Sequence, residues 1–344
     1  MTENKIEVEV HYEVLRSGAV LKEIYAANVP TINMDSETEL KTAISGEFYD
    51  YTSVDFLSDK LRVIVDLNGI LYTCGIFCIT TESRYKSDGV VFVNIEGYSL
   101  LYTVQQSKIE TRIHLASGAL YTTSLTGLLI DAGITDYSVT ASTLTLAADR
   151  DDWEIGESRL KVINDLLSEI SYNSAYMDNS GKVVLTETQE PITANLSETY
   201  IADKYSIISP EYSVVNDYHG KANVFKIICS NPDLDLPLTA TSENNISTSP
   251  FCIANIGRIL KLTRVNNIAS QAALQLKADE LRMKSLISSE EVVFTTAISP
   301  THSVFDIVAL DNDALLGVYA ETSWSMSLSA SSLMTHKAKK ALYE

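Results

Sequence analysis

Residues suited to catalysis and metal binding are scarce in this chain of 344 residues, and their scarcity excludes several classes of site. There are 14 glycines, and the sequence contains no phosphate-cradling glycine loop, dinucleotide fingerprint, G-x-S-x-G elbow or HExxH motif. The five histidines are scattered, which favours a structural or surface role for each: His11, His114, His219, His302 and His336. The sequence therefore predicts no catalytic residue, no metal ligand and no cofactor.

Cysteine is also scarce, with four residues. Cys74 and Cys78 have the wrong spacing for a CxxC redox or zinc motif, and Cys229 and Cys252 do not supply a second such pair. The pattern predicts buried free thiols in a reducing cytoplasm rather than a metal site or disulfides.

Long apolar runs are absent. The sequence begins Met1-Thr-Glu-Asn-Lys-Ile-Glu7, without a basic start followed by an apolar stretch, so we expect no secretory signal. No run of roughly 18 apolar residues occurs, so we expect no membrane insertion by this chain.

Basic residues are outnumbered by acidic ones, 26 against 45, which gives a formal net charge of −19. A field of this sign repels phosphate backbones, so a role in gripping nucleic acid is not expected. The acidity could equally serve only to keep the protein soluble.

The first hundred residues have the patterns of β-strands. Ile6, Val8 and Val10 alternate with acidic or polar residues, as in a half-buried strand. The run 61–67 and the run 70–73 flank Asn68-Gly69, a dipeptide typical of tight hairpin turns, and Asp88-Gly89 marks another turn. These signals predict a meander of antiparallel strands, in a small barrel or sandwich.

Helical spacing begins after residue 107. Apolar residues recur on one face between Glu157 and Tyr172, which predicts a helix there, and shorter signals predict helices over 122–130 and 270–288. A hairpin is expected around 178–181, between strands at 175–177 and 182–186. The last third returns to strands at 223–229, 257–263 and 318–328. The polar stretches 231–237 and 241–250 predict surface loops. No internal sequence repeat is evident.

Several short motifs follow one another along the middle and last thirds of the chain. The first is Trp153-Glu-Ile-Gly156 followed by a helix with Leu160, Ile163, Leu166 and Leu167, then Tyr172 and a D-x-x-G hairpin. Next come Ala222-Asn-Val224 and Ser249-Pro-Phe251, which precedes Gly257-Arg258. The last ones are Pro300-Thr-His302, Tyr319-Ala-Glu-Thr-Ser-Trp324 and Met334-Thr-His336. In this order the motifs resemble those of the tail hub proteins of phages that infect Gram-positive bacteria, although Ala222 stands where the family's P-N-V entry to a strand has a proline.

This resemblance covers roughly residues 40–344, and it implies an α+β, mainly β fold. Two tube-type antiparallel β-barrel domains, over 1–106 and 206–344, would flank a mixed α/β unit over 107–205, with the helix near 270–288 inserted in the second barrel. Trp153, Gly156, the apolar stripe of the helix and Trp324 would then form a structural core signature.

The resemblance also implies a function and a set of partners. Three copies would form a pseudo-sixfold ring, the tail-tip or baseplate hub, which joins the sixfold tail tube to a threefold central spike or fibre and lines the channel. Partners would be the tail tube or distal tail protein and other baseplate proteins, with the tape-measure protein as a further candidate and DNA only as passing cargo. The location would be the virion tail tip, after assembly in the host cytoplasm. Because the sequence stops at Glu344, without the hydrolase or receptor-binding extension of many relatives, we expect no enzyme activity.

The family resemblance suggests a second role for the many acidic residues. Carboxylates that line a channel would repel DNA and let it pass, and Glu7, Glu9 and Glu13 share one face of the first strand. We expect these three side chains to face the channel. A phage-derived bacteriocin passes no DNA and could keep the same lining.

Two other functions stay open from the residues alone. The 18 tyrosines and the polar loop 241–250 would suit a carbohydrate-binding receptor module. Acidic clusters, at Asp149 with Asp151 and Asp152 and at Asp311 with Asp313, could serve a cell-wall hydrolase, although solvated turns explain them as well.

Overall fold

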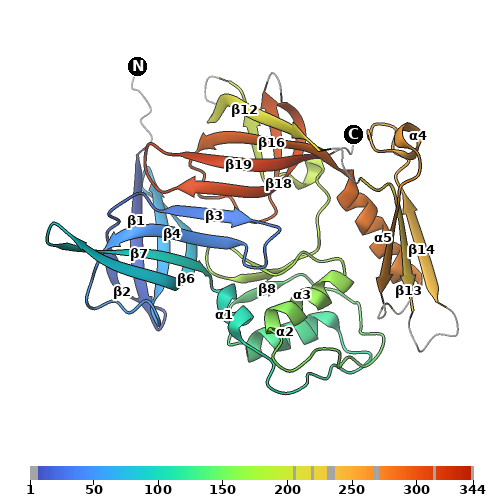
Figure 1. Cartoon of the computed structure of the whole chain (residues 1–344), viewed down its shortest axis with the longest axis horizontal. Helices are drawn as coiled ribbons and strands as arrows, with labels where there is room; N and C mark the ends of the chain where they lie inside the picture. The colour runs from blue at the N-terminus through green and yellow to red at the C-terminus, as the bar shows by residue number, and fades with distance from the viewer. Residues whose placement is uncertain are drawn as a thin grey trace.

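The structure is a computed structural model of the whole chain (Figure 1), and it describes residues 7–203, 207–217, 221–230, 237–265, 268, 271–312 and 315–341. Ile6, Asp313 and residues 231–236 of the expected polar loop lie outside this part of the chain.

Most of the described secondary structure is β-strand. The strands of the first β-rich region and of the middle unit are β1 (Val8–Arg16), β2 (Ala19–Ile24), β3 (Thr31–Asp35), β4 (Thr42–Tyr49), β5 (Lys60–Leu67), β6 (Ile70–Ser87), β7 (Val90–Ser99), β8 (Tyr137–Val139), β9 (Tyr176–Met177) and β10 (Val183–Leu185). The later strands are β11 (Glu198–Ile201), β12 (Ile208–Asn216), β13 (Val224–Cys229), β14 (Leu238–Glu243), β15 (Leu260–Val265), β16 (Ile287–Ala297), β17 (Ile307–Asn312), β18 (Leu315–Ser327) and β19 (Leu333–Ala341). The helices are α1 (Leu101–Gln106), α2 (Tyr121–Asp131), α3 (Arg159–Glu169), α4 (Ile253–Ile256) and α5 (Gln271–Leu286), with a 3₁₀ turn at Thr193–Asn195.

One 13-stranded sheet joins the two ends of the chain. Its order is β12-β16-β19-β18-β3-β4-β7-β6-β5-β1-β2, with β17 also on β18 and β11 on β17. The second half of β18 pairs antiparallel with β3, so Trp324 lies opposite Met34. Figure 1 shows the early strands at the left and the late strands above them, in blue and red. The α+β, mainly β class predicted from the sequence is confirmed.

The strand ladders of the described residues do not close into two separate barrels. The sheet path is open and ends at β2 and β12, because β3 leaves the first region and continues the sheet through β18 into the second. In the first region a single bridge, between Ala26 and Phe48, links the end of the β1–β2 hairpin to β4. The cores of the two regions are distinct, although Trp324 and Met334 pack in the first one.

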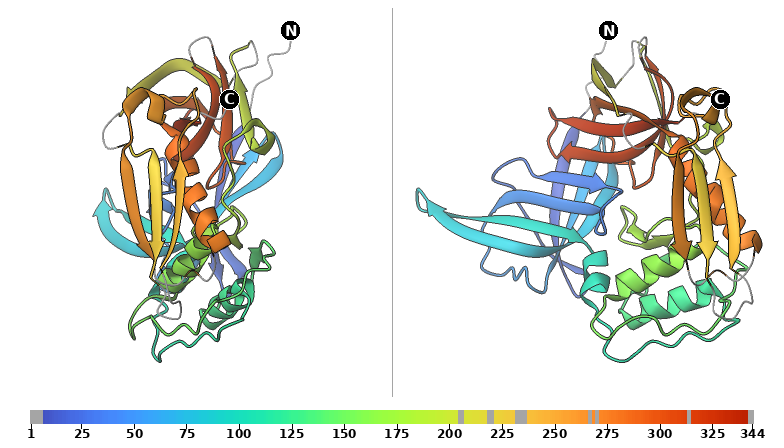
Figure 2. Two further views of the ribbon diagram at one scale, coloured as in Figure 1. Left: turned by 90° about the vertical axis from the view of Figure 1, so that its right-hand side faces the viewer. Right: turned by 45° about the vertical axis from the view of Figure 1, so that its right-hand side comes forward.

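The predicted hairpin turns are present. Asn68 and Gly69 take φ angles of 54° and 85°, and Asp88 and Gly89 take 50° and 85°. Left-handed angles at both central residues fit the right-handed twist of the flanking strands. The second turn caps a long β6–β7 hairpin that extends beyond the body of the protein (Figure 2).

The middle unit packs α2 and α3 around the apolar stripe predicted from the sequence. Leu160, Ile163, Leu166 and Leu167 are all fully buried in its core. The hydroxyl of Ser158 accepts a hydrogen bond from the Lys161 N–H at 3.1 Å and caps the helix. The expected hairpin is formed by β9 and β10, and β8 adds a parallel strand.

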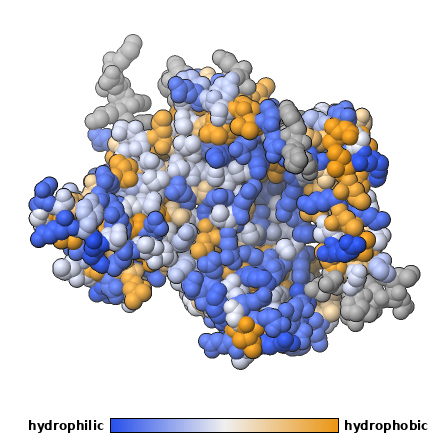
Figure 3. Space-filling view, in the orientation of Figure 1, coloured by the Kyte–Doolittle hydropathy of each residue, from blue (hydrophilic) through white to orange (hydrophobic). Residues whose placement is uncertain are grey.

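A further unit, formed by β13, β14, β15 and α5, lies at the right of Figure 1. Here one expectation was wrong: residues 241–243 were predicted to be loop, but they end β14, which pairs along its whole length with β13. The backbone groups of this polar segment are satisfied by that neighbour, which local composition does not reveal. Apolar side chains gather on the outside of this sheet, at Ile259, Leu260 and Leu262 (Figure 3).

The cysteines and the helices bear on two expectations from the sequence, buried free thiols and no membrane-spanning segment. All four cysteines are free and buried, as predicted. Among the described residues, no helix has the length and apolar character needed to cross a membrane.

Truncation of a buried side chain on the apolar stripe of α3 tests the core of the middle unit. Replacing Leu166 or Ile163 by alanine should lower the free energy of unfolding by about 2–5 kcal/mol, because each leaves a cavity in a packed core. Ile130→Ala, at an α2 position that is 55% exposed, is the matched control and should change it by less than about 1 kcal/mol. Chemical denaturation measures all three, and parent-like stability of both core variants would contradict the packing.

Candidate functional site: a buried histidine and glutamate cluster

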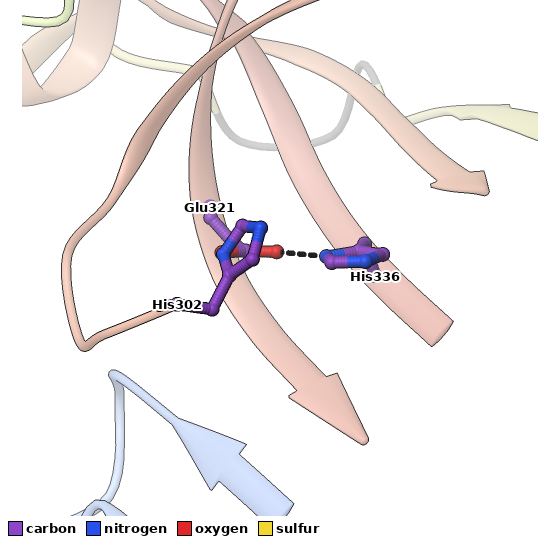
Figure 4. Close-up of side chains that lie close together, drawn as sticks. All are labelled: His302, Glu321 and His336. Carbon is purple, nitrogen blue, oxygen red and sulfur yellow. Dashed lines mark hydrogen bonds and ion pairs between the residues drawn. The ribbon is translucent and has the colours of Figure 1, made fainter. Parts of the chain in front are cut away.

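Three residues from separate motifs meet inside the second β-rich region. His302 lies in the loop between β16 and β17, Glu321 on β18 and His336 on β19, and both rings face the Glu321 carboxylate (Figure 4). Their exposed fractions are 2%, 3% and 0%. The sequence motifs P-T-H, Y-x-E-x-x-W and M-T-H therefore converge on one buried point.

Every ring nitrogen of the cluster has a hydrogen-bond partner. Nδ1 of His302 is 3.0 Å from Glu321 Oε2, and Nδ1 of His336 is 2.5 Å from Glu321 Oε1. On the far sides of the rings, Nε2 of His302 contacts the Tyr200 hydroxyl and Nε2 of His336 lies 2.8 Å from the Thr296 hydroxyl. The network thus ties together β11, β16, β18, β19 and the loop that carries His302.

The two histidines differ in charge. Burial alone would lower the pKa of His302, but hydrogen bonds to Asp306 and Glu321 outweigh it and raise the pKa to about 10. Burial lowers the pKa of His336, despite its bond to Glu321 and with the charge of His302 nearby. At neutral pH the cluster therefore holds one imidazolium, between Asp306 and Glu321, and one neutral imidazole.

This arrangement is suited to holding strands together. His302, Glu321 and His336 each offer one possible metal-ligand atom, and these atoms lie within 4.8 Å of one another. However, the nitrogens and both carboxylate oxygens are already engaged in hydrogen bonds. A cavity of about 640 Å³ is lined in part by Glu321. The side chain of Glu321 is nevertheless fully buried, so a substrate in the cavity could not approach the carboxylate.

Glu321 also occupies a special place in its strand. The register of β18 against β19 shifts between Glu321 and Ser323. Before this bulge β18 pairs with β17, and after it β18 pairs with β3. The buried carboxylate therefore fixes the point at which β18 passes from one neighbour to the other.

Most residues of the proposed core signature are buried. Trp153 packs in the middle unit, where its indole N–H donates to Asp165 at 3.0 Å and its ring lies under the Arg150 guanidinium. Gly156, in contrast, is exposed. Its φ of 95° and the hydrogen bond from its N–H to the Ile109 carbonyl show a turn position, so it is not part of the core. Trp324 is buried and donates to the Ser303 carbonyl at 3.2 Å.

The three glutamates expected in the channel lie at or just before β1. Glu9 is exposed on β1, and Glu7 precedes the strand, with its N–H bonded to Asn68. Glu13 forms an ion pair with Arg62 of the neighbouring β5. Val8 and Val10 pack against the core on the other face, which agrees with the predicted alternation. Their orientation toward a channel stays a prediction.

The acidic groups considered for hydrolysis are engaged locally. Asp149 accepts a hydrogen bond from the Ser117 N–H at 2.7 Å, and Asp152 forms an ion pair with Arg150. Arg150 in turn binds Glu169 on α3. These contacts are those of a loop fastened to the middle unit.

Comparisons with solved structures find the same fold in several tail proteins. The chain has a TM-score of 0.66 with a tail protein from Neisseria meningitidis MC58, at 13% identity over 96% of each chain. It scores 0.65 with the 43 kDa tail protein of prophage MuSo2 from Shewanella oneidensis, at 12% identity, with 96% of this chain and 98% of that one covered. The prophage tail protein gp18 from Listeria monocytogenes follows at 0.59 and 12%, over 97% and 95%. No family model and no curated protein matches the sequence. The chain therefore shares the fold of these three tail proteins along nearly its whole length.

Titration of His302 gives a test of the cluster. Its folded-state pKa of about 10 lies above the ordinary value of 6.5. Protonation therefore stabilises the fold fully below about pH 6.5, and this stabilisation is lost as pH rises toward 10. The free energy of unfolding should fall by up to about 1.4 kcal/mol per pH unit across this window.

The measurement is denaturant unfolding of the parent and of His302→Gln between pH 6 and 10. The difference between the two should shrink as pH rises, since glutamine does not titrate. His114→Gln, at an exposed histidine, is the control and should follow the parent. A difference that is the same at every pH would contradict a charged His302.

Proposed function

We propose that this protein is a structural subunit of a tail-tip hub, and that three copies form the ring between a tail tube and a central spike or fibre. The observation that carries the proposal is the fold, shared along nearly the full length of this chain and of three tail proteins, two of them from prophages. The order of the hub-like motifs gives independent support, because the last three of them build the buried cluster.

The proposed role is mechanical rather than enzymatic. The His302–Glu321–His336 cluster is closed to substrates, and its bonds fix five segments of one sheet region. Asp149 and Asp152, the carboxylates considered for a hydrolase, are bound to Ser117 and Arg150. A rigid sheet held by buried charge would suit a subunit that must keep its shape under load.

The partners follow from this position. The ring would contact the tail tube or distal tail protein on one side and the spike or fibre on the other, with baseplate proteins around it and DNA as passing cargo. The protein would then reside at the tail tip of the virion, after assembly in the host cytoplasm.

The oligomeric state tests the hub directly. The full chain should form trimers at micromolar concentration, because the sheet of the described residues ends at β2 and β12, and no described strand pairs with their outer edges. Light scattering of the purified protein, alone and with its tube protein, gives the measurement. One copy per tail tip in images of the assembled particle would contradict the proposal.

The channel-facing assignment of Glu7, Glu9 and Glu13 has its own test. Replacing all three by lysine should slow DNA ejection from particles, through attraction to phosphate that weakens as salt rises. Glu13→Lys would place a second cation beside Arg62 and could destabilise the fold. A variant with Glu13→Gln in its place separates this loss of stability from the effect of charge on ejection. Glu154→Lys, at an exposed residue of the middle unit, is the control. Unchanged ejection by particles that carry all three lysines would contradict the assignment.

A further inference from the structure

The two β-rich regions have the same strand connectivity. In the first, the antiparallel order is β3-β4-β7-β6-β5; in the second it is β12-β16-β19-β18-β17, also antiparallel throughout. The strands thus correspond one to one: β3 to β12, β4 to β16, β5 to β17, β6 to β18 and β7 to β19. We call these sets the first and the second repeat.

Local irregularities of the backbone coincide in the two repeats. The register of β6 against β7 shifts between Ile79 and Thr81, as that of β18 against β19 shifts between Glu321 and Ser323. Gly75 precedes Ile79 by as many residues as Gly317 precedes Glu321. These glycines have φ angles of 132° and 134°, a region that residues with a side chain rarely adopt. The match extends to single residues, which fixes the alignment of the repeats.

The repeats touch within one chain through β3 and β18. The first half of β18 pairs with β17, and its second half, on the same edge, pairs with β3 between Ser323–Ser327 and Thr31–Asp35. In the first repeat β6 pairs with β5 over its first half in the same way. Its second half has no strand on that edge in the part of the chain described, and its side chains from Thr81 to Ser87 are exposed.

β12, the counterpart of β3, also has an edge that no described strand covers. β12 pairs with β16 on one edge, and no described strand pairs with its other edge. Residues 210–216 are exposed, among them Tyr212, Val214 and Val215. In the described part of the chain the contact between repeats is therefore made once, and both of its components occur a second time without a strand partner: the outer edge of β12 over 210–216 and the second half of β6. They lie at different places on the molecule, at the top and at the left of Figure 1.

We propose that β12 of one copy pairs with the second half of β6 of a neighbouring copy, and so repeats between copies the β3–β18 contact made within each copy. This inference rests on the proposed ring and names the surfaces that close it. Backbone groups on two strand edges would pair, and apolar side chains exposed on β12 would be covered. Because the contact is head to tail, each copy offers one edge of each kind. Contacts of this kind generate a ring when the rotation that relates the copies closes, as the proposed hub requires.

The alignment of the repeats also gives the register between copies. Within one chain, Met326 lies opposite Ile32 and Ser325 opposite Asn33. In the alignment of the repeats, Met326 corresponds to Arg84 and Ile32 to Val214. The proposed contact therefore places Arg84 of one copy opposite Val214 of the next. Ser83 then lies opposite Val215, on the other face of the sheet.

Disulfide trapping tests this register in the full chain. A copy with Ser83→Cys and a copy with Val215→Cys, mixed and oxidised, should form a covalent dimer, because residues directly opposite in paired strands have Cβ atoms about 4.5–5.5 Å apart, and a small shift of the two edge strands brings them to disulfide distance. The double variant should form covalent closed rings. The native cysteines are buried, so background cross-linking is low. Ser83→Cys mixed with Ser213→Cys, which is two residues out of register, is the control and should react at least about tenfold more slowly.

A second experiment needs no cysteine. Val215→Lys, at a position 55% exposed, should leave the free energy of unfolding within about 0.5 kcal/mol of the parent, while raising the dissociation constant of the oligomer at least about tenfold. Val20→Lys is the matched control: Val20 is 51% exposed on β2, at the other end of the sheet, and should leave the oligomer unchanged.

The outcomes separate the two proposals. Trimers by light scattering without the Ser83–Val215 cross-link, or trimers weakened by Val20→Lys and not by Val215→Lys, overturn the β12–β6 contact and leave the ring. A chain that forms neither oligomer nor cross-link, alone or with its tube protein, overturns both.

Discussion

The buried carboxylate of Glu321 holds the strand through which the two β-rich regions are joined. It lies at the bulge of β18, where pairing passes from β17 to β3. A charged group at this depth is costly unless it is paired and hydrogen-bonded. The two histidines supply those bonds, and Tyr200 and Thr296 complete the network from β11 and β16. The passage of the sheet from one region to the other therefore depends on the correct assembly of five segments.

The sequence predicted local structure well and long-range structure poorly. The apolar stripe of α3 and the Asn68-Gly69 turn depend on neighbours a few residues away, and both were predicted. The pairing of β3 with β18 joins residues almost the whole chain apart, and no local pattern specifies it. The β14 residues 241–243 have a polar composition typical of loops, and only β13 makes them a strand. The same limit applied to the cluster: three motifs were visible, but not that His302, Glu321 and His336 meet.

The two repeats show why the sequence gives no sign of duplication. Equivalent positions lie in different surroundings, so different side chains suit them. Trp324 is buried beside β3, whereas Glu82, at the same place on β6, is exposed. At the bulge itself, Glu321 corresponds to Ile79. Ile79 faces Gly97, where a Cβ would lie 2.6 Å from the Cys78 carbonyl oxygen, whereas Glu321 faces Ala338. Gly75 and Gly317 keep one identity, because there the backbone rather than the environment sets the requirement.

The exposed edge of β12 has a consequence for the newly made protein. A strand edge that is free in water can recruit any extended segment, including that of an unrelated chain, and grow into aggregates. Pro210 lies in β12, and the register against β16 is interrupted between Ile208 and Tyr212. Since proline lacks an N–H, it shortens the stretch that can accept a foreign strand. In the proposed ring, a copy that has not yet met its neighbour would thus be partly protected from pairing with other chains.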